Sequence, residues 1–129
     1  MLIEVLQAKI HNVRITQTEL NYTGSITMDM DLVDEAGMIP NQKVLIVNNN
    51  NGERFETYII EGDRGSGVIC TNGAAAHCAR KGDCLIIVAF LSIENEKANI
   101  YKPKLVYVDQ DNKRVDAELI DKKLVKILG

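Results

Sequence analysis

The segment RFETY at residues 54–58 places a carboxylate-binding cation and a proton donor four residues apart. Side chains alternate between the two faces of a strand, so Arg54, Glu56 and Tyr58 share one face while Phe55 and Thr57 share the other. Arginine binds carboxylates through two parallel hydrogen bonds, and tyrosine carries its proton at neutral pH. The spacing therefore fits a carboxylate-binding site with an acid beside it, although an exposed polar strand face has the same pattern.

Gly24 and Ser25 interrupt NYTGSITMD, residues 21–29, which otherwise has the composition of a strand. Glycine weakens a strand, so its presence predicts a sharp bend or a close backbone approach. The pair recurs as Gly65 and Ser66 in the loop GDRGSG, and the dipeptide by itself therefore predicts no chemistry. This loop matches neither of the common phosphate-binding patterns, and we interpret it as a surface turn rather than a phosphate cradle.

The segment NGAAAH at residues 72–77 leaves the backbone little shielded, because three alanines follow Asn72 and Gly73. Backbone N–H groups of Gly73, Ala74 and Ala75 at the start of a short helical turn are able to bind a carboxylate. A tightly packed turn that accepts only alanine is the alternative interpretation.

The three cysteines, Cys70, Cys78 and Cys84, form no C-x-x-C pair. His77 and Cys78 are adjacent, which is a poor arrangement for two ligands of one tetrahedral zinc. We therefore predict small buried thiols and no metal site. An odd number of cysteines without a signal peptide predicts reduced thiols and a cytoplasmic location.

Composition describes one ordinary globular domain over residues 1–129, with a net charge of −3. Aromatic residues make up 5% and tryptophan is absent, so the core must be aliphatic. The acidic balance argues against a nucleic acid partner, and no apolar run reaches membrane-spanning length, so we expect no membrane partner either.

Most segments have the period or composition of short strands. The most apolar of them is DCLIIVAFLSI at residues 83–93, which is predicted to be the central strand. Residues 31–38 predict a short helix that Asp31 caps and Gly37 ends. Asn51 and Gly52 predict a hairpin with a type I′ turn. Apolar residues at helical spacing in 120–128 predict an amphipathic helix. Many short strands with few helices indicate a small, mostly β barrel.

Taken together, the motifs resemble the aspartate 1-decarboxylase family over about residues 1–110. The matching segments keep the order and spacing of that family and are KIH (9–11), Y-x-GS (22–25), NG-x-R-x-x-TY (51–58), RGSG (64–67), NGAAAHC (72–78) and GD (82–83). Asn21 departs from the pattern, because relatives commonly have histidine there. The C-terminal segment is variable in the family and adds nothing.

The resemblance implies a six-stranded double-psi β-barrel that assembles as a homotetramer. It also implies a proenzyme that cleaves itself between Gly24 and Ser25 into residues 1–24 and 25–129, leaving a covalent pyruvoyl group made from Ser25. Tyr22, Thr57 and Asn72 would assist this cleavage by holding the Gly24 carbonyl or its oxyanion. The residues leave open whether a helper protein takes part.

By the same resemblance, the pyruvoyl ketone would form a Schiff base with L-aspartate and act as an electron sink for its decarboxylation to β-alanine and CO2, in pantothenate and coenzyme A biosynthesis. Tyr58 would reprotonate the product carbanion. The substrate-binding residues implied are Lys9, Arg54, Thr57, Gly73, Ala74 and Ala75. Thr57 lies on the opposite strand face from Tyr58, which is consistent with sites at subunit boundaries. The alternative is a non-enzymatic barrel module that binds a small carboxylate or phosphate, with Ser25 unprocessed.

Overall fold

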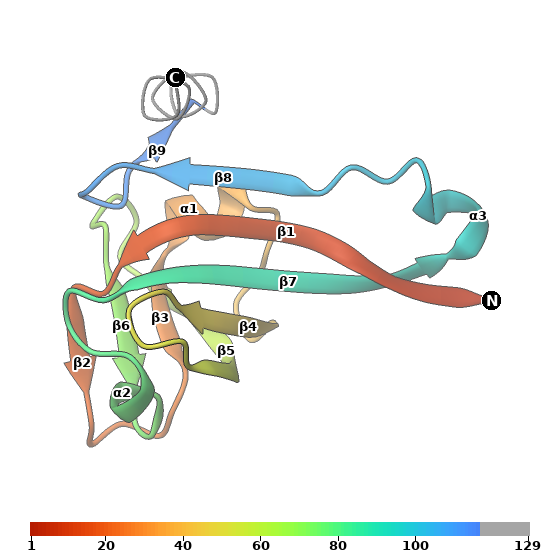
Figure 1. Cartoon of the computed structure of the whole chain (residues 1–129). Helices are drawn as coiled ribbons and strands as arrows, with labels where there is room; N and C mark the ends of the chain where they lie inside the picture. Colours follow the sequence, from red (N-terminus) through yellow and green to blue (C-terminus); the bar gives the residue numbers. More distant parts are fainter. Residues whose placement is uncertain (117–129) are drawn as a thin grey trace.

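The computed structural model describes residues 1–116, which form one sheet with three short helices (Figure 1). The order of the strands across the sheet is β2-β6-β3-β5-β4-β7-β1-β8-β9. The elements are β1 (Leu2–Arg14), β2 (Gln17–Glu19), β3 (Ile26–Asp29), α1 (Met30–Glu35), β4 (Lys43–Asn48), β5 (Arg54–Gly62), β6 (Ile69–Asn72), α2 (Ala75–Cys78), β7 (Cys84–Glu94), α3 (Asn95–Ala98), β8 (Lys104–Val108) and β9 (Arg114–Val115).

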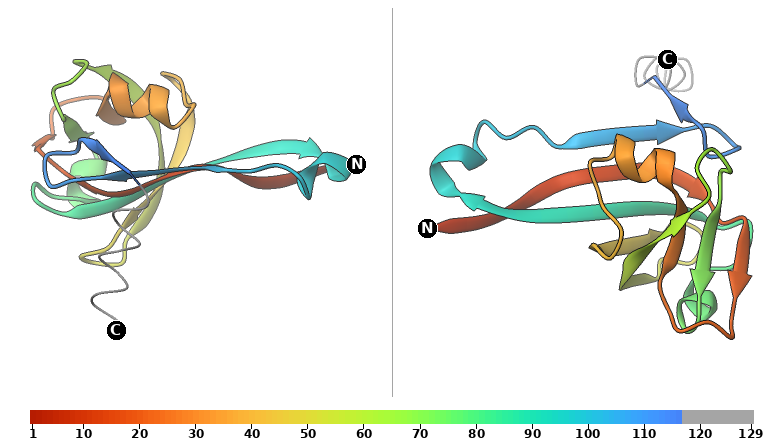
Figure 2. Two further views of the ribbon diagram at one scale, coloured as in Figure 1. Left: turned by 90° about the horizontal axis from the view of Figure 1, so that it is seen from above. Right: turned by 180° about the vertical axis from the view of Figure 1, so that it is seen from behind.

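Six neighbouring strands, from β6 to β1 in the sheet order, make the body of a small barrel. The barrel closes where β1 ends, because the Thr16 N–H donates to the Ile69 carbonyl at the start of β6 over 2.8 Å. β1 and β7 continue beyond this body as a long antiparallel ribbon, in which Leu2 lies opposite Glu94, and α3 sits at its tip (Figure 2). The predicted small, mostly β barrel is confirmed.

The core is aliphatic, as the composition predicts. Side chains from β1, β3, β4, β5, β6 and β7 meet in its centre with no exposed surface, among them Ile10, Ile26, Met28, Ile46, Ile59, Ile69, Leu85 and Ile87. The predicted central position of residues 83–93 is confirmed, because β7, which begins at Cys84, lies between β4 and β1. The helix predicted in 120–128 lies outside the described residues.

The predicted helix near residues 31–38 forms one residue earlier, as α1, and its cap was wrongly assigned. The side chain of Asp29, not Asp31, accepts the first free N–H, that of Asp31, at 2.9 Å. Asp29 is 1% exposed, although strand alternation places it on the solvent face. Asp29 is buried because its carboxylate also accepts hydrogen bonds from N–H groups of the Gly-rich loop at residues 62–67.

The predicted hairpin at Asn51 and Gly52 joins β4 to β5, but its turn is not type I′. Gly52 has φ of 76° while Asn51 is not among the residues with positive φ. Instead the Asn48 side chain accepts from the Asn50 N–H, and the Asn51 side chain accepts from the Glu53 N–H, both at 2.9 Å. Asparagine side chains that bond the backbone two residues on favour this longer loop over the two-residue turn.

Candidate functional site

Ser25 is buried at the entry to β3 in a backbone conformation that serine rarely adopts. Its φ is 96°, that of Gly24 is 91°, and the serine is 2% exposed. A non-glycine residue in this region stores roughly 1–3 kcal/mol of strain, which persists only where the surroundings enforce it. The peptide bond between Gly24 and Ser25 is therefore held in a strained geometry at a buried position.

The pairing of β3 with β6 explains what surrounds Ser25. Thr27 lies opposite Cys70 in this antiparallel pair. The Asn72 N–H continues the ladder by donating to the Ser25 carbonyl at 3.0 Å. Residues two apart on a strand share a face, so the side chains of Ser25, Thr27, Cys70 and Asn72 gather on the same side.

Asn72 is the centre of this cluster, because its side-chain amide contacts the other three side chains. Its Nδ2 donates to Ser25 Oγ at 3.0 Å and to Thr27 Oγ1 at 2.9 Å, while its Oδ1 accepts from Cys70 Sγ at 3.3 Å. Ser25 and Asn72 were predicted as site residues from their motifs, whereas Thr27 and Cys70 were not. The two-residue spacing on each strand was the signal that could have found them.

Gly73 lets the chain before Ser25 approach the segment after Asn72. A Cβ at this position would lie 2.6 Å from the Gly24 nitrogen and 2.6 Å from the Tyr22 carbonyl oxygen. Gly73 also has φ of 62°, and its N–H donates to the Glu19 carbonyl at 2.8 Å. The structure thus brings Tyr22, Gly24 and Gly73 together by backbone contact, while the Tyr22 side chain is 50% exposed.

The one-turn helix α2 carries Ala75, directly after Gly73 and Ala74, as NGAAAH predicts. Its last residue is anchored from the β4–β5 loop, because Asn48 Nδ2 and Asn51 Nδ2 both donate to the Cys78 carbonyl at 3.0 Å. Asn48 is fully buried. This anchor fixes the C-terminal end of the helical turn that follows Gly73 and Ala74.

Arg54 and Tyr58 lie on the outer face of β5, and Thr57 faces the other way, as strand alternation predicts. Along β5, Arg54 and Tyr58 are exposed, Tyr58 by 39%, and Thr57 is half-buried. Continuing the parallel register of β3 and β5, which starts with Ile26 opposite Ile59, aligns Gly24 with Thr57. The same continuation aligns Ser25 with Tyr58, so the strained bond lies beside this pair of neighbouring β5 residues.

Lys9 shares the outer face with Arg54 and Tyr58 but lies three strands away. It is opposite Val88 on β7, Val88 is opposite Leu45 on β4, and Leu45 is opposite Glu56 on β5. Strands are spaced about 4.8 Å apart, so the backbones of Lys9 and β5 are roughly 14 Å apart. Within one subunit, the backbone of Lys9 is therefore separated from that of β5 by the width of β7 and β4.

His11, two residues from Lys9 on β1, stacks on Tyr107 with ring centroids 4.8 Å apart. Burial, and then the charge of Lys9, lower the pKa of His11. The imidazole is therefore neutral at pH 7, and Lys9 supplies the positive charge on this part of the sheet.

The Gly-rich loop at residues 62–67 does bind a carboxylate, but one from the chain itself. The N–H groups of Gly65 and Gly67 donate to the two carboxylate oxygens of Asp29 at 2.9 and 2.8 Å. Burial opposes ionisation of Asp29, but the N–H groups of Gly67, Asp31 and Gly65 and the charge of Lys113 outweigh it and lower its pKa. The interpretation as a surface turn rather than a phosphate cradle is confirmed, because Asp29 fills the loop.

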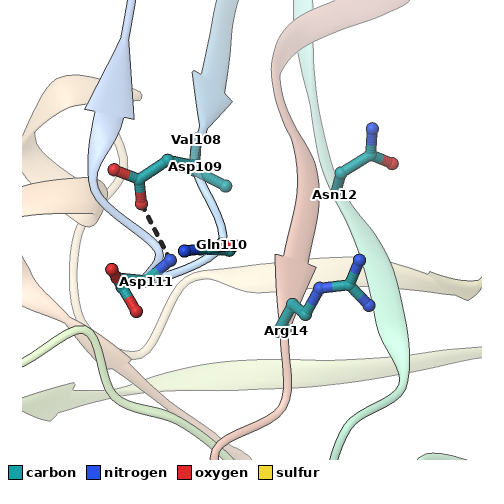
Figure 3. Close-up of a pocket in the computed structure, with 6 residues that line it drawn as sticks. All are labelled: Asn12, Arg14, Val108, Asp109, Gln110 and Asp111. Carbon is teal, nitrogen blue, oxygen red and sulfur yellow. Dashed lines mark hydrogen bonds between the residues drawn. The ribbon is translucent and has the colours of Figure 1, made fainter.

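An open hollow lies between the ends of β1 and β8, away from these residues (Figure 3). Its lining is formed by Asn12, Arg14, Val108, Asp109, Gln110 and Asp111. None of these belongs to the candidate site. Among residues 1–116, no three His, Cys, Asp or Glu side chains form a metal-binding group, and no helix is long and apolar enough to cross a membrane.

Fold and site together define a small β-barrel protein with a buried, strained Gly-Ser bond that an asparagine amide contacts. The family model for aspartate decarboxylase matches residues 1–115. An aspartate 1-decarboxylase from Parabacteroides distasonis is 57% identical over 84% of this chain and 94% of its own length. One from Chlorobium chlorochromatii is 54% identical over 93% of each chain, and one from a Geobacillus species is 53% identical over 84% of this chain and 86% of its own. The chain belongs to the aspartate decarboxylase family.

Proposed function

We propose that this chain is the proenzyme of a carboxy-lyase that converts L-aspartate to β-alanine and CO2, for pantothenate and coenzyme A biosynthesis. Membership of the aspartate decarboxylase family supports the reaction. The observation that carries the proposal in this chain is Ser25, which is buried with φ of 96° and hydrogen-bonded by Asn72. The barrel binding module without catalysis, considered above, is not favoured, because such a module has no use for a strained bond.

The first event is self-cleavage between Gly24 and Ser25. Ser25 Oγ attacks the Gly24 carbonyl carbon and loses its proton, the C–N bond breaks, and the freed nitrogen takes the proton, which leaves an ester. Loss of the Ser25 Cα proton then breaks the Cβ–Oγ bond and releases Gly24 as a carboxylate. The remaining dehydroalanine takes up water and releases ammonia, which gives a pyruvoyl group on residue 25. Release of backbone strain at Ser25 favours the first step.

Three residues assist this cleavage. Asn72 Nδ2 lies 3.0 Å from Ser25 Oγ and stabilises negative charge as the hydroxyl proton leaves. Thr57 is assigned to the Gly24 carbonyl by the family resemblance, and continuing the register of β3 and β5 aligns the two residues. Tyr22 holds the segment before the bond, since its carbonyl packs against Gly73. The products are residues 1–24 and residues 25–129.

When formed, the pyruvoyl group supplies the electron sink for loss of the substrate α-carboxylate. The residues around Ser25 fit this group, since the serine is buried and Asn72 offers a donor beside it. Arg54 and Lys9 bind the substrate carboxylates, and the backbone of Gly73, Ala74 and Ala75 positions the substrate, with Thr57 beside it. Tyr58 holds the proton that replaces CO2.

The active unit is a homotetramer with sites at subunit boundaries. The outer face of the sheet carries Arg54, Tyr58 and Lys9 together with apolar side chains such as Phe90, which is 46% exposed. Packing this face against another copy buries the apolar surface and lets Tyr58 of one subunit serve the Ser25 region of its neighbour. The three free cysteines fit a reducing cytoplasm, where we place the reaction.

Intact mass of the purified chain, followed during incubation, tests the proposal. We expect two fragments divided after Gly24, with the larger lighter by one ammonia than the peptide of residues 25–129. A chain that stays whole after prolonged warming contradicts the proposal. That result would favour the non-enzymatic binding module instead. Release of CO2 from L-aspartate is measured on the same samples. Tyr58→Phe should cleave normally and lose roughly a hundredfold or more of this activity, which separates the two chemistries.

A further inference from the structure

Cys70 is a buried polar residue that the chemistry described above does not use. It is 3% exposed, and its Sγ lies 3.3 Å from Asn72 Oδ1 and 3.9 Å from the Thr71 carbonyl oxygen. The shorter contact makes the Asn72 amide its main hydrogen-bond acceptor. The thiol therefore contacts the residue that contacts Ser25.

A side-chain amide has a donor end and an acceptor end, and its neighbours decide which way it points. Ser25 Oγ and Thr27 Oγ1, which Asn72 Nδ2 contacts, are hydroxyls and are able to donate or accept. These two contacts alone do not select an orientation. The Cys70 thiol donates its proton to Asn72 Oδ1, and a thiol sulfur is only a weak acceptor, so Cys70 favours the orientation with Oδ1 toward the sulfur.

We propose that Cys70 is a positioning residue for self-cleavage, because its thiol holds the Asn72 amide with the donor end toward Ser25. This inference rests on the proposed function. With Nδ2 toward Ser25, the serine oxygen receives a hydrogen bond while its own proton is free to leave. With the amide reversed, the serine hydroxyl would donate to Asn72 Oδ1 and keep its proton engaged.

The surroundings of Cys70 keep the thiol protonated. Burial raises the pKa of Cys70, a hydrogen bond from the Gln17 side chain opposes this, and the charge of Glu19 adds to it. Gln17 and Glu19 lie on β2, where they face Cys70 and Asn72 across the parallel pair of β2 and β6. No positive charge from β2 or β3 lies in these ladder positions to stabilise a thiolate.

The test compares Cys70→Ser, which keeps a donor, with Cys70→Val and Cys70→Ala, which remove it. Freshly purified precursor of each variant is followed by intact mass, and its melting temperature is measured. We expect the serine variant to cleave within about threefold of the parent, and the valine and alanine variants about tenfold slower, which corresponds to one lost hydrogen bond. Cys84→Val is the matched control, since Cys84 bonds Asn12 at a different part of the fold, and should cleave at the parent rate.

A second comparison separates positioning from packing. In an Asn72→Ala background, Cys70→Ser and Cys70→Val should cleave at equal rates, because no amide remains to be oriented. The inference is overturned if Cys70→Val and Cys70→Ala cleave as fast as the parent, if Cys70→Ser is as slow as they are, or if the difference persists without Asn72.

A readout that needs no cleavage distinguishes failure of this inference from failure of the proposed function. A parent chain that never cleaves contradicts the proposed function. Hydrogen exchange of the Asn72 side-chain amide protons is measured on the uncleaved precursors. These protons should be protected in the parent and in Cys70→Ser, and should lose protection in Cys70→Val. Equal protection in all three contradicts the positioning role whether or not the chain cleaves.

Discussion

The chain contains two Gly-Ser pairs, and they differ in everything except sequence. Ser66 is exposed, donates to the Asp63 carbonyl at 2.5 Å and accepts from the Val68 N–H at 3.1 Å, so its hydroxyl completes a local turn. Ser25 is buried with positive φ, and its hydroxyl accepts from Asn72, 47 residues away. Reactivity thus depends on strain and on a distant donor, neither of which a dipeptide contains.

The difference also appears in what each loop binds. The N–H groups of Gly65 and Gly67, on either side of Ser66, donate to the Asp29 carboxylate, which fastens that loop to the start of α1. The segment before Ser25 is held by close backbone contact with Gly73. The loop at Gly65 and Ser66 is a structural turn whose N–H groups are hydrogen-bonded within the chain. The segment at Gly24 and Ser25 instead holds a strained bond beside the Asn72 side chain.

The largest expected effect distinguishes the two serines directly. Ser25→Ala should abolish both cleavage and CO2 release, because the attacking oxygen and the source of the pyruvoyl group are lost together. Ser66→Ala is the matched control and should retain both. Intact mass and a CO2 assay measure the outcome, and CO2 release by Ser25→Ala would contradict the mechanism.

The next effect concerns the donor that Ser25 has and Ser66 lacks. Asn72→Ala should slow cleavage roughly a hundredfold, the usual loss on removing one side-chain donor that stabilises developing negative charge. Asn112→Ala is a useful comparison, because Asn112 is equally buried but bonds the Arg14 backbone and the Gly67 carbonyl. It should lower the melting temperature without a comparable loss of cleavage rate per folded molecule. Equal effects of the two variants on that rate would remove Asn72 from the mechanism.

A third prediction concerns the packing that holds the strained segment. Gly73→Ala and Gly52→Ala both place alanine at positive φ, which costs about 1–2 kcal/mol. Only at Gly73 does the new Cβ meet backbone atoms, at 2.6 Å, whereas nothing lies within 4 Å at Gly52. Gly73→Ala should therefore be less stable than Gly52→Ala by roughly 1–3 kcal/mol, as for overpacked sites, and should cleave more slowly. Denaturant unfolding and intact mass measure both, and equal stabilities would show that the close approach is unimportant.

The last prediction has the smallest expected effect on cleavage, because it concerns the stability of the Gly-rich loop that Asp29 binds. Asp29→Asn replaces an oxygen that accepts from Gly67 with a donor, and should cost about 1.5–3 kcal/mol at pH 7. Because folding lowers the pKa of Asp29, the carboxylate contributes its full stability above the ordinary aspartate value near pH 4. It loses this stability progressively as the pH falls from that value through the lower pKa of the folded state. The difference between parent and variant in thermal unfolding should shrink below about pH 4.

Asp34→Asn serves as the control for this pH dependence. Asp34 forms an exposed ion pair with Arg64 at 2.6 Å, and exposed pairs contribute little. It should change the melting temperature little at any pH. A pH-independent loss in Asp29→Asn would mean that the carboxylate charge is not what the glycine N–H groups bind.

Much of the fold could be predicted from local pattern, and the failures have identifiable causes. Alternation of Arg54, Glu56 and Tyr58 against Phe55 and Thr57 was visible along the chain and appears in β5. The cap of α1 was misassigned because Asp29 is selected by a loop more than thirty residues away. The turn after Asn48 differs from type I′ because neighbouring asparagine side chains bond the backbone in ways that dipeptide statistics do not contain.

By itself, the sequence determined the aliphatic core, the strand periodicity, the family and the residue types for its chemistry, because composition and spacing are local properties. Only the tertiary structure decided which side chains meet. The register of β3 against β6 places Asn72 on Ser25 and adds Thr27 and Cys70. The two strands between β1, which carries Lys9, and β5 separate residues that the motifs grouped together. The physical reason is that strand pairing and burial join residues far apart in the chain, and the strain at Ser25 exists only because those partners enforce it.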